Sequence, residues 1–159
     1  MKTNKGQAGF SLIELLIVVA IIGIIAAIAI PNLLASKRAA NEGSAQSSTR
    51  TLTSAEATYA ATVGNGAYGD RAALLGQGLI DSVLAGGLKS GYNFEITETG
   101  DGTSASPYAY VTGAAPAVHG GVSATGTRQF TSDATGVIYA AAAAGTTAPT
   151  ATSGTPIGQ

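Results

Sequence analysis

The side chain whose chemistry departs most from its surroundings is the carboxylate of Glu14. It is the only charge between Lys5 and Lys37, and sixteen apolar residues, 15–30, follow it directly. A carboxylate near the centre of a membrane helix costs roughly 2.5 to 3.5 kcal/mol on insertion scales. Glu14 lies near the end of the run and could reach the head groups at a smaller cost. It is therefore either an interfacial carboxylate without a function or one half of an ion pair that forms when chains pack together.

The other reactive side chains form no recognisable catalytic or metal site. The chain has no cysteine and one histidine, His119, which excludes thiolate and two-histidine metal sites and leaves no convincing catalytic triad. Scattered acids could supply oxygen ligands to calcium, but they lack the dense spacing of a calcium loop and are more simply solvated turn residues. These acids are Asp70, Asp81, Glu95, Asp101 and Asp133. We expect no enzyme, no metal and no cofactor.

Charge and composition limit the classes of binding partner that we expect. The formal net charge is −1, which provides no basic field for nucleic acid. Charged residues make up 11% of the chain, below the roughly 25% of ordinary soluble domains. The apolar residues are concentrated near the N-terminus, while the rest of the chain is rich in Ala, Gly, Thr and Ser.

The apolar run has the length of a membrane span. Counted from Phe10 to Ile30 it extends about 31 Å at roughly 1.5 Å per residue, against about 30 Å for a hydrocarbon core. It is apolar on all sides, unlike a helix that packs one stripe on a soluble core. It is also longer than the apolar region of a secretory signal, and Pro31-Asn32 follows it instead of a small-residue cleavage site. Basic residues flank both ends, so charge alone decides little about orientation.

The helical pattern continues beyond Pro31. Residues 32–62 contain no further proline, and apolar residues recur at three- and four-residue spacing. One face comprises Leu52, Ala55, Tyr59, Thr62 and Val63, and the opposite face comprises Arg50, Ser54 and Thr58. One helix is predicted from about Phe10 to about Thr62, with an apolar first half and an amphipathic second half. A kink or local unwinding is expected at Pro31.

The remaining chain predicts a small antiparallel sheet. Short helical turns are expected at 70–75 and 78–84, and the alternation of Tyr92, Phe94 and Ile96 with polar residues predicts a half-buried strand. A second strand is expected at 108–111 and a hairpin at 128–139. Residues 112–127 are expected to form a loop, and the chain from Ala140 is expected to be an unstructured tail. The predicted fold class is α+β, with the long helix packed on one face of the sheet.

The N-terminal sequence carries a family resemblance. Residues 9–34 read GFSLIELLIVVAIIGIIAAIAIPNLL, which combines a glycine, an aromatic residue, a glutamate four residues later, an apolar run and a Pro-Asn. This pattern resembles the N-terminal segment of type IV pilins and of the pseudopilins of type II secretion systems. The resemblance implies cleavage by a prepilin peptidase between Gly9 and Phe10, N-methylation of Phe10, and a single-pass inner-membrane precursor with a cytoplasmic N-terminus.

Cleavage would create the cation that Glu14 lacks. The new amine of Phe10 lies about one helical turn from Glu14, but the positive end of the same helix makes an intrachain pair a poor arrangement. The Phe10 amine of a neighbouring subunit is the better partner, and breaking such a buried pair costs about 3 to 5 kcal/mol. The resemblance implies the same assembly role for Glu14. Pro31 is either a tolerated kink or a point of unwinding that lets helices slide in the fibre.

The expected organisation has five parts: a cleaved leader at 1–9, a transmembrane and filament-core helix at 10–31, an amphipathic helix half at 32–62, an α+β globular head at 63–139 and a low-complexity tail at 140–159. Small residues in the apolar helix permit close packing of copies, and head-to-tail contacts give a helical filament.

The first hypothesis for function is a structural subunit of an extracellular type IV pilus. The alternatives are a type II secretion pseudopilin and, from another class, a monomeric membrane-anchored binding domain. The implied partners are other copies of the chain, the inner membrane, a prepilin peptidase and methyltransferase, and pilus assembly machinery.

Overall fold

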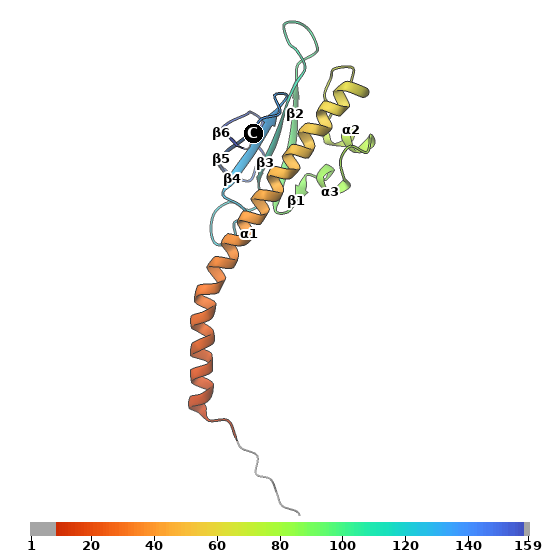
Figure 1. Cartoon of the computed structure of the whole chain (residues 1–159). Helices are drawn as coiled ribbons and strands as arrows, with labels where there is room; N and C mark the ends of the chain where they lie inside the picture. The colour runs from red at the N-terminus through yellow and green to blue at the C-terminus, as the bar shows by residue number, and fades with distance from the viewer. Residues whose placement is uncertain (1–8, 158–159) are drawn as a thin grey trace, which may run out of the picture. The chain divides into compact units, whose positions relative to one another are not determined.

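The computed structural model describes residues 9–157 (Figure 1). The chain divides into two compact units between Ala35 and Ser36. Helix α1 (Leu12–Thr62) begins in the first unit and ends in the second. It starts two residues later than predicted and ends at the predicted residue. The predicted α+β class, with a long N-terminal helix packed on an antiparallel sheet, is confirmed.

The part of α1 in the first unit exposes its apolar side chains on all sides. Its large hydrophobic residues, from Leu12 to Leu33, are all at least 45% exposed within the chain. By length and composition, α1 is the one helix among the described residues that could cross a membrane. It continues through Pro31 without a break, and Asn32 Nδ2 donates a hydrogen bond to the carbonyl of Ile28 at 3.1 Å. Unwinding at Pro31 stays a prediction for the fibre.

The part of α1 in the second unit buries one face. Leu52 and Ala55 lie in the core and Tyr59 packs against it, as predicted, while Arg50, Ser54 and Thr58 are exposed, also as predicted. The prediction was wrong for Thr62 and Val63, which are exposed. The helix positions that contact the core end at Tyr59, so the apolar spacing continues past the surface that it could bury.

The sheet has six strands in a simple meander. Each strand pairs antiparallel with the next one in the sequence, in the order β1-β2-β3-β4-β5-β6. The strands are β1 (Leu88–Lys89), β2 (Tyr92–Thr99), β3 (Ala109–Pro116), β4 (Arg128–Asp133), β5 (Ile138–Ala142) and β6 (Thr155–Ile157). The predicted alternation in β2 is confirmed, because Tyr92, Phe94 and Ile96 are buried.

Two capped turns complete the core. Helices α2 (Arg71–Gly76) and α3 (Ser82–Ala85) lie beside α1 (Figure 1). The carboxylates of Asp70 and Asp81 accept hydrogen bonds from backbone N–H groups three residues later, at 2.7 and 2.6 Å. Such N-caps each stabilise a helix start by about 1 kcal/mol. Leu74 and Leu84 enter the core beside the sheet residues.

The prediction of a loop at 112–127 was wrong for residues 112–116. Strand β3 continues to Pro116 and pairs with β2 along its whole length, from Thr99↔Ala109 to Tyr92↔Pro116. The Gly and Ala residues of this segment have weak strand propensity. The backbone hydrogen bonds to β2 and β4 override that preference.

The prediction of an unstructured tail from Ala140 was also wrong. Strand β5 continues to Ala142, and β6 pairs with it. Between these strands the chain crosses the sheet face that does not hold the core. Asn93 Nδ2 donates to the carbonyl of Thr146 at 2.9 Å, and the N–H of Ser153 donates to Thr131 Oγ1 at 3.3 Å. This segment binds through its backbone, so its low-complexity composition was a misleading signal.

Candidate functional site

The predicted processing junction precedes the first turn of α1. Gly9, Phe10 and Ser11 lie outside the helix, and Phe10 is 78% exposed. A Cβ built on Gly9 would meet no described atom within 4 Å. The junction is therefore an open backbone segment, which a protease cleft requires. The predicted leader, 1–9, lies outside the described residues except for Gly9.

Glu14 lies exposed in the first turn of α1. A negative charge here interacts favourably with the N-terminal end of the helix dipole, typically by about 0.3 to 1 kcal/mol. Within residues 9–157, no ion pair involves Glu14. The three pairs found there are Arg71–Glu95, Lys89–Asp81 and Arg128–Glu42.

The four predicted site residues do not form one cluster. Gly9, Phe10 and Glu14 lie within one short stretch of chain, whereas Pro31 follows Glu14 by seventeen positions, or about 25 Å along a helix at roughly 1.5 Å per residue. The small residues Ala20, Gly23, Ala26, Ala27 and Ala29 lie between them on α1. Pro31 therefore cannot act on the junction directly.

Burial of a charged group on the second half of α1 was not predicted. Glu42 Oε1 accepts hydrogen bonds from the N–H and hydroxyl of Thr127, and its Oε2 accepts from Arg128 Nε, each at 2.8 Å. Burial opposes ionisation of this carboxyl, but these hydrogen bonds and the Arg128 charge outweigh it and lower the pKa of Glu42. Glu42 thus anchors the start of β4 to α1.

Arg38 and Asn41, which precede Glu42 in α1, bind the loop that leads into β4. The Arg38 guanidinium donates to the carbonyls of Gly121, Val122 and Ala124 at 3.4, 3.0 and 3.3 Å. Asn41 Nδ2 donates to the carbonyl of Thr125 at 2.9 Å. Together with Glu42, these side chains replace water as hydrogen-bond partners for a loop that has few large apolar residues.

A second buried glutamate on α1 has the opposite electrostatics. Glu56 is 0% exposed, its Oε2 accepts from the N–H of Gly69 at 3.0 Å, and its Oε1 has no hydrogen-bond partner among the described residues. Burial raises the pKa of Glu56 to about 7, and the nearby Glu98 and Asp70 carboxylates add to the rise. Near neutral pH, Glu56 therefore exchanges between its charged and neutral forms.

A heptad pattern could have identified both glutamates. Residues 42, 49 and 56 are seven apart, and so are 45, 52 and 59; together they follow the three-four spacing of a buried helix face. Four of these positions carry Glu42, Ala45, Thr49 and Leu52, and all four are buried. Apolar spacing alone does not reveal the polar positions of this face.

The scattered acids serve local structure. Asp101 Oδ1 accepts from the N–H and hydroxyl of Thr103, and Asp133 Oδ1 accepts from those of Thr135, so both stabilise turns. Glu95 pairs with Arg71. No group of three or more His, Cys, Asp or Glu residues that could hold a metal ion occurs in the part of the chain that the structure describes.

Comparison with known proteins identifies the N-terminal segment. The family described as the prokaryotic N-terminal methylation motif matches residues 4–30. A type IV wide pilus major component, PilA4 of Thermus thermophilus, is 60% identical over 38 residues, which are 24% of this chain and 29% of that protein. A type IV major pilin protein, PilA of Myxococcus xanthus, is 45% identical over 56 residues, which are 35% of this chain and 26% of that protein. No solved structure matches the chain.

The matched part is short but contains the whole junction. The chain spans between a quarter and a third of the length of each of these two relatives. The methylation motif nevertheless includes Gly9, Phe10 and Glu14 together with the apolar run to Ile30. With the prokaryotic N-terminal methylation motif at its start and a long N-terminal helix packed on an antiparallel sheet, the chain is similar to type IV pilins.

Proposed function

We propose that this protein is a structural subunit of a type IV pilus, processed between Gly9 and Phe10, N-methylated at Phe10 and polymerised into a helical surface fibre. The observation that carries the proposal is the apolar half of α1, which no part of the described chain covers. Burying one Leu, Ile or Val side chain is worth about 1.5 to 3 kcal/mol. A helix that exposes more than a dozen of them needs lipid or other helices around it.

In this proposal the apolar helix occupies two environments in turn, first the inner membrane and then the fibre. The precursor is a single-pass inner-membrane protein, with residues 1–9 as a cytoplasmic leader and the helix from 10–31 in the bilayer. In the fibre the same helix is surrounded by copies of itself. Residues 32–62 connect it to the head, in which we include the C-terminal segment that the sheet binds.

Glu14 is the group that makes addition of a subunit selective. A Phe10 amine from the incoming copy neutralises the Glu14 carboxylate in an apolar environment, where an unpaired charge is costly. The amine exists only after cleavage, so processing precedes assembly for a chemical reason. The partners implied are a prepilin peptidase and methyltransferase and an assembly machine that withdraws the subunit from the membrane.

Intact-mass spectrometry of the membrane and fibre forms tests the processing step. We expect a chain that begins at Phe10 and carries one added methyl group. A chain that keeps residues 1–9 in assembled material would overturn the proposal. Gly9→Val is the matched variant, because a β-branched residue blocks close approach of the backbone to a cleft, and it should accumulate as the uncut precursor.

Glu14→Val tests the assembly step. The variant should remain in the membrane fraction at wild-type abundance but be absent from sheared fibres. Glu14→Asp is the control, because it keeps the charge and should retain part of the assembly. Normal fibres from Glu14→Val would exclude the pairing.

Deletion of the gene separates a pilin from a pseudopilin. Loss of surface fibres in electron micrographs supports the pilin. Unchanged fibres together with lost protein secretion would instead favour a type II secretion pseudopilin.

A further inference from the structure

The second unit contains an arginine without a partner on a face of α1 that the head leaves open. Arg71, Lys89 and Arg128 form ion pairs, and Arg38 binds loop carbonyls. Arg50 is exposed and makes no hydrogen bond or ion pair with any residue from 9 to 157. The guanidinium of Arg50 is therefore available to a partner outside the chain.

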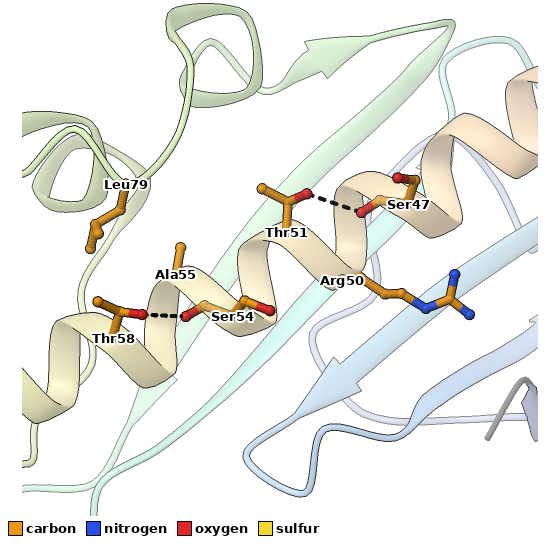
Figure 2. Close-up of a pocket in the computed structure, with 7 residues that line it drawn as sticks. All are labelled: Ser47, Arg50, Thr51, Ser54, Ala55, Thr58 and Leu79. Carbon is orange, nitrogen blue, oxygen red and sulfur yellow. Dashed lines mark hydrogen bonds between the residues drawn. The ribbon is translucent and has the colours of Figure 1, made fainter.

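The surface around Arg50 is concave and rich in hydroxyl groups (Figure 2). Two shallow cavities of about 390 and 370 Å³ share Arg50 and Ser54; Leu79 lines the first, and Thr135 in the β4–β5 turn lines the second. The Arg50 side chain extends from α1 away from Leu79 (Figure 2). A groove on each side of a guanidinium suits a projecting side chain with a carboxylate.

The hydroxyls beside Arg50 differ in what they can offer a ligand. Thr51 and Thr58 donate to the carbonyls of Ser47 and Ser54, at 3.2 and 2.9 Å, so their hydrogens are used inside α1 (Figure 2). The hydroxyls of Ser47 and Ser54 make no hydrogen bond with the described residues and remain available. The groove therefore presents one guanidinium and two hydroxyl donors, which match a carboxylate.

The same head carries an acidic group that lacks a cation. Glu98 is exposed on β2 and has no ion pair or hydrogen bond among the described residues. Partial burial of its carboxyl group, and then the Asp70 carboxylate, raise the pKa of Glu98. The buried Glu56 Oε1, which has no hydrogen-bond partner, is under the electrostatic influence of both carboxylates. A cation placed against Glu98 would offset the repulsion among the carboxylates of Glu98, Asp70 and Glu56.

The proposed contact between Glu14 of one copy and the Phe10 amine of its neighbour fixes the axial offset between the two copies. It shifts one copy by four residues along the helix, or about 6 Å at roughly 1.5 Å per residue. In identical copies every residue undergoes the same axial shift. Within the second unit, an axial shift of about 6 Å brings Arg50 of the shifted copy to the level of residue 54, two residues before Glu56. A flexible arginine side chain spans that difference.

We propose that Arg50 of one copy binds Glu98 of the adjacent copy, the copy whose Glu14 also receives its Phe10 amine. The inference rests on the proposed function. The copy that supplies the amine supplies the guanidinium, and the copy that supplies Glu14 supplies Glu98. The Arg50–Glu98 contact and the contact of the Phe10 amine with Glu14 thus select the same neighbour. The hydroxyls of Ser47 and Ser54 donate further hydrogen bonds to the Glu98 carboxylate.

Charge reversal in the full-length protein tests this pairing. Arg50→Glu and Glu98→Lys should each reduce fibre yield at least tenfold, at unchanged subunit abundance. The double variant Arg50→Glu/Glu98→Lys should recover most of the yield. Lys37→Glu is the matched control, because it makes the same charge change at another exposed cation, and its fibres should be normal.

The outcomes separate this inference from the proposed function. Absence of fibres in the wild type would overturn both. Normal fibres from Arg50→Glu, no recovery in the double variant, or equal losses in Lys37→Glu would overturn the inference and leave the pilin proposal intact.

Cross-linking gives a second measurement. The chain has no cysteine, so Arg50→Cys/Glu98→Cys, co-assembled with an excess of wild type, can be treated with a short bis-maleimide. We expect covalent dimers in the fibres, and none from Lys37→Cys/Glu98→Cys, since Lys37 lies roughly 20 Å further down the helix. Fibres that contain the double-cysteine variant but yield no dimers would overturn the pairing.

Discussion

The substitution Glu56→Gln should change how the stability of this protein depends on pH. Glu56 is fully buried, and its pKa is raised from 4.5 to about 7, chiefly by burial and further by Glu98 and Asp70. The folded protein therefore binds a proton that the unfolded chain releases above its ordinary pKa. The stability that this group contributes is fully present below about pH 4.5, and it is lost as the pH rises to about 7.

The size of the effect follows from the pKa. Each pKa unit corresponds to about 1.36 kcal/mol, so ionisation of Glu56 lowers the free energy of unfolding by roughly 3 kcal/mol between pH 4.5 and pH 8. Glutamine cannot ionise, and its carbonyl can still accept the hydrogen bond from Gly69. The difference in unfolding free energy between the variant and the wild type should therefore shift by about 3 kcal/mol in favour of the variant across this range.

Urea unfolding of the full chain in detergent micelles measures this difference. The protein has six tyrosines and no tryptophan, so tyrosine fluorescence follows the head. Glu42→Gln is the control of opposite sign, because a lowered pKa contributes stability above the unfolded pKa that is lost as the pH falls through the folded one. A difference between Glu56→Gln and the wild type that stays constant from pH 4.5 to pH 8 would refute the reasoning.

Three substitutions, Glu42→Gln among them, test the packing of the head. Glu42→Gln removes the charged partner of Arg128 and should lower the unfolding free energy by about 1 to 3 kcal/mol at neutral pH, measured by urea unfolding. Leu52→Ala leaves a cavity at a residue that is fully buried between α1 and the sheet, and should lower the thermal midpoint with a loss of about 2 to 5 kcal/mol. Gly113→Ala places a methyl group against the carbonyl of Pro149; it should cost about 1 to 3 kcal/mol and speed amide exchange in 143–157, and unchanged exchange there would contradict the packing described.

Much of the local structure could be predicted because its signals are local. The short helical turn predicted at 70–75 and the inward residues of β2 depend on spacings of two to four residues. The predicted hairpin at 128–139 is likewise formed by β4 and β5. These elements appeared where the pattern indicated them, with boundaries that moved by only a few residues.

The segments that were mispredicted are those with small side chains. The Gly-Ala part of β3 and the chain from Ala140 show no apolar alternation, yet both bind to the sheet. Their stability comes from backbone hydrogen bonds and from the close approach that Gly113 permits to Pro149. Such contacts depend on strands that lie far away in the sequence, so no short window contains the information.

The sequence by itself determined the apolar helix and predicted the processing junction before it. A continuous apolar run that contains a single charge can be recognised without knowledge of the folded structure. Only the tertiary structure decided the different states of Glu42 and Glu56, which lie fourteen residues apart on one helix face. Thr127 and Arg128, 85 and 86 residues further along the chain, hold Glu42 ionised. Glu56 instead meets acidic neighbours and has one oxygen without a partner among the described residues. The difference is physical: burial removes water from both carboxylates, and distant segments decide which of them receives donors in its place.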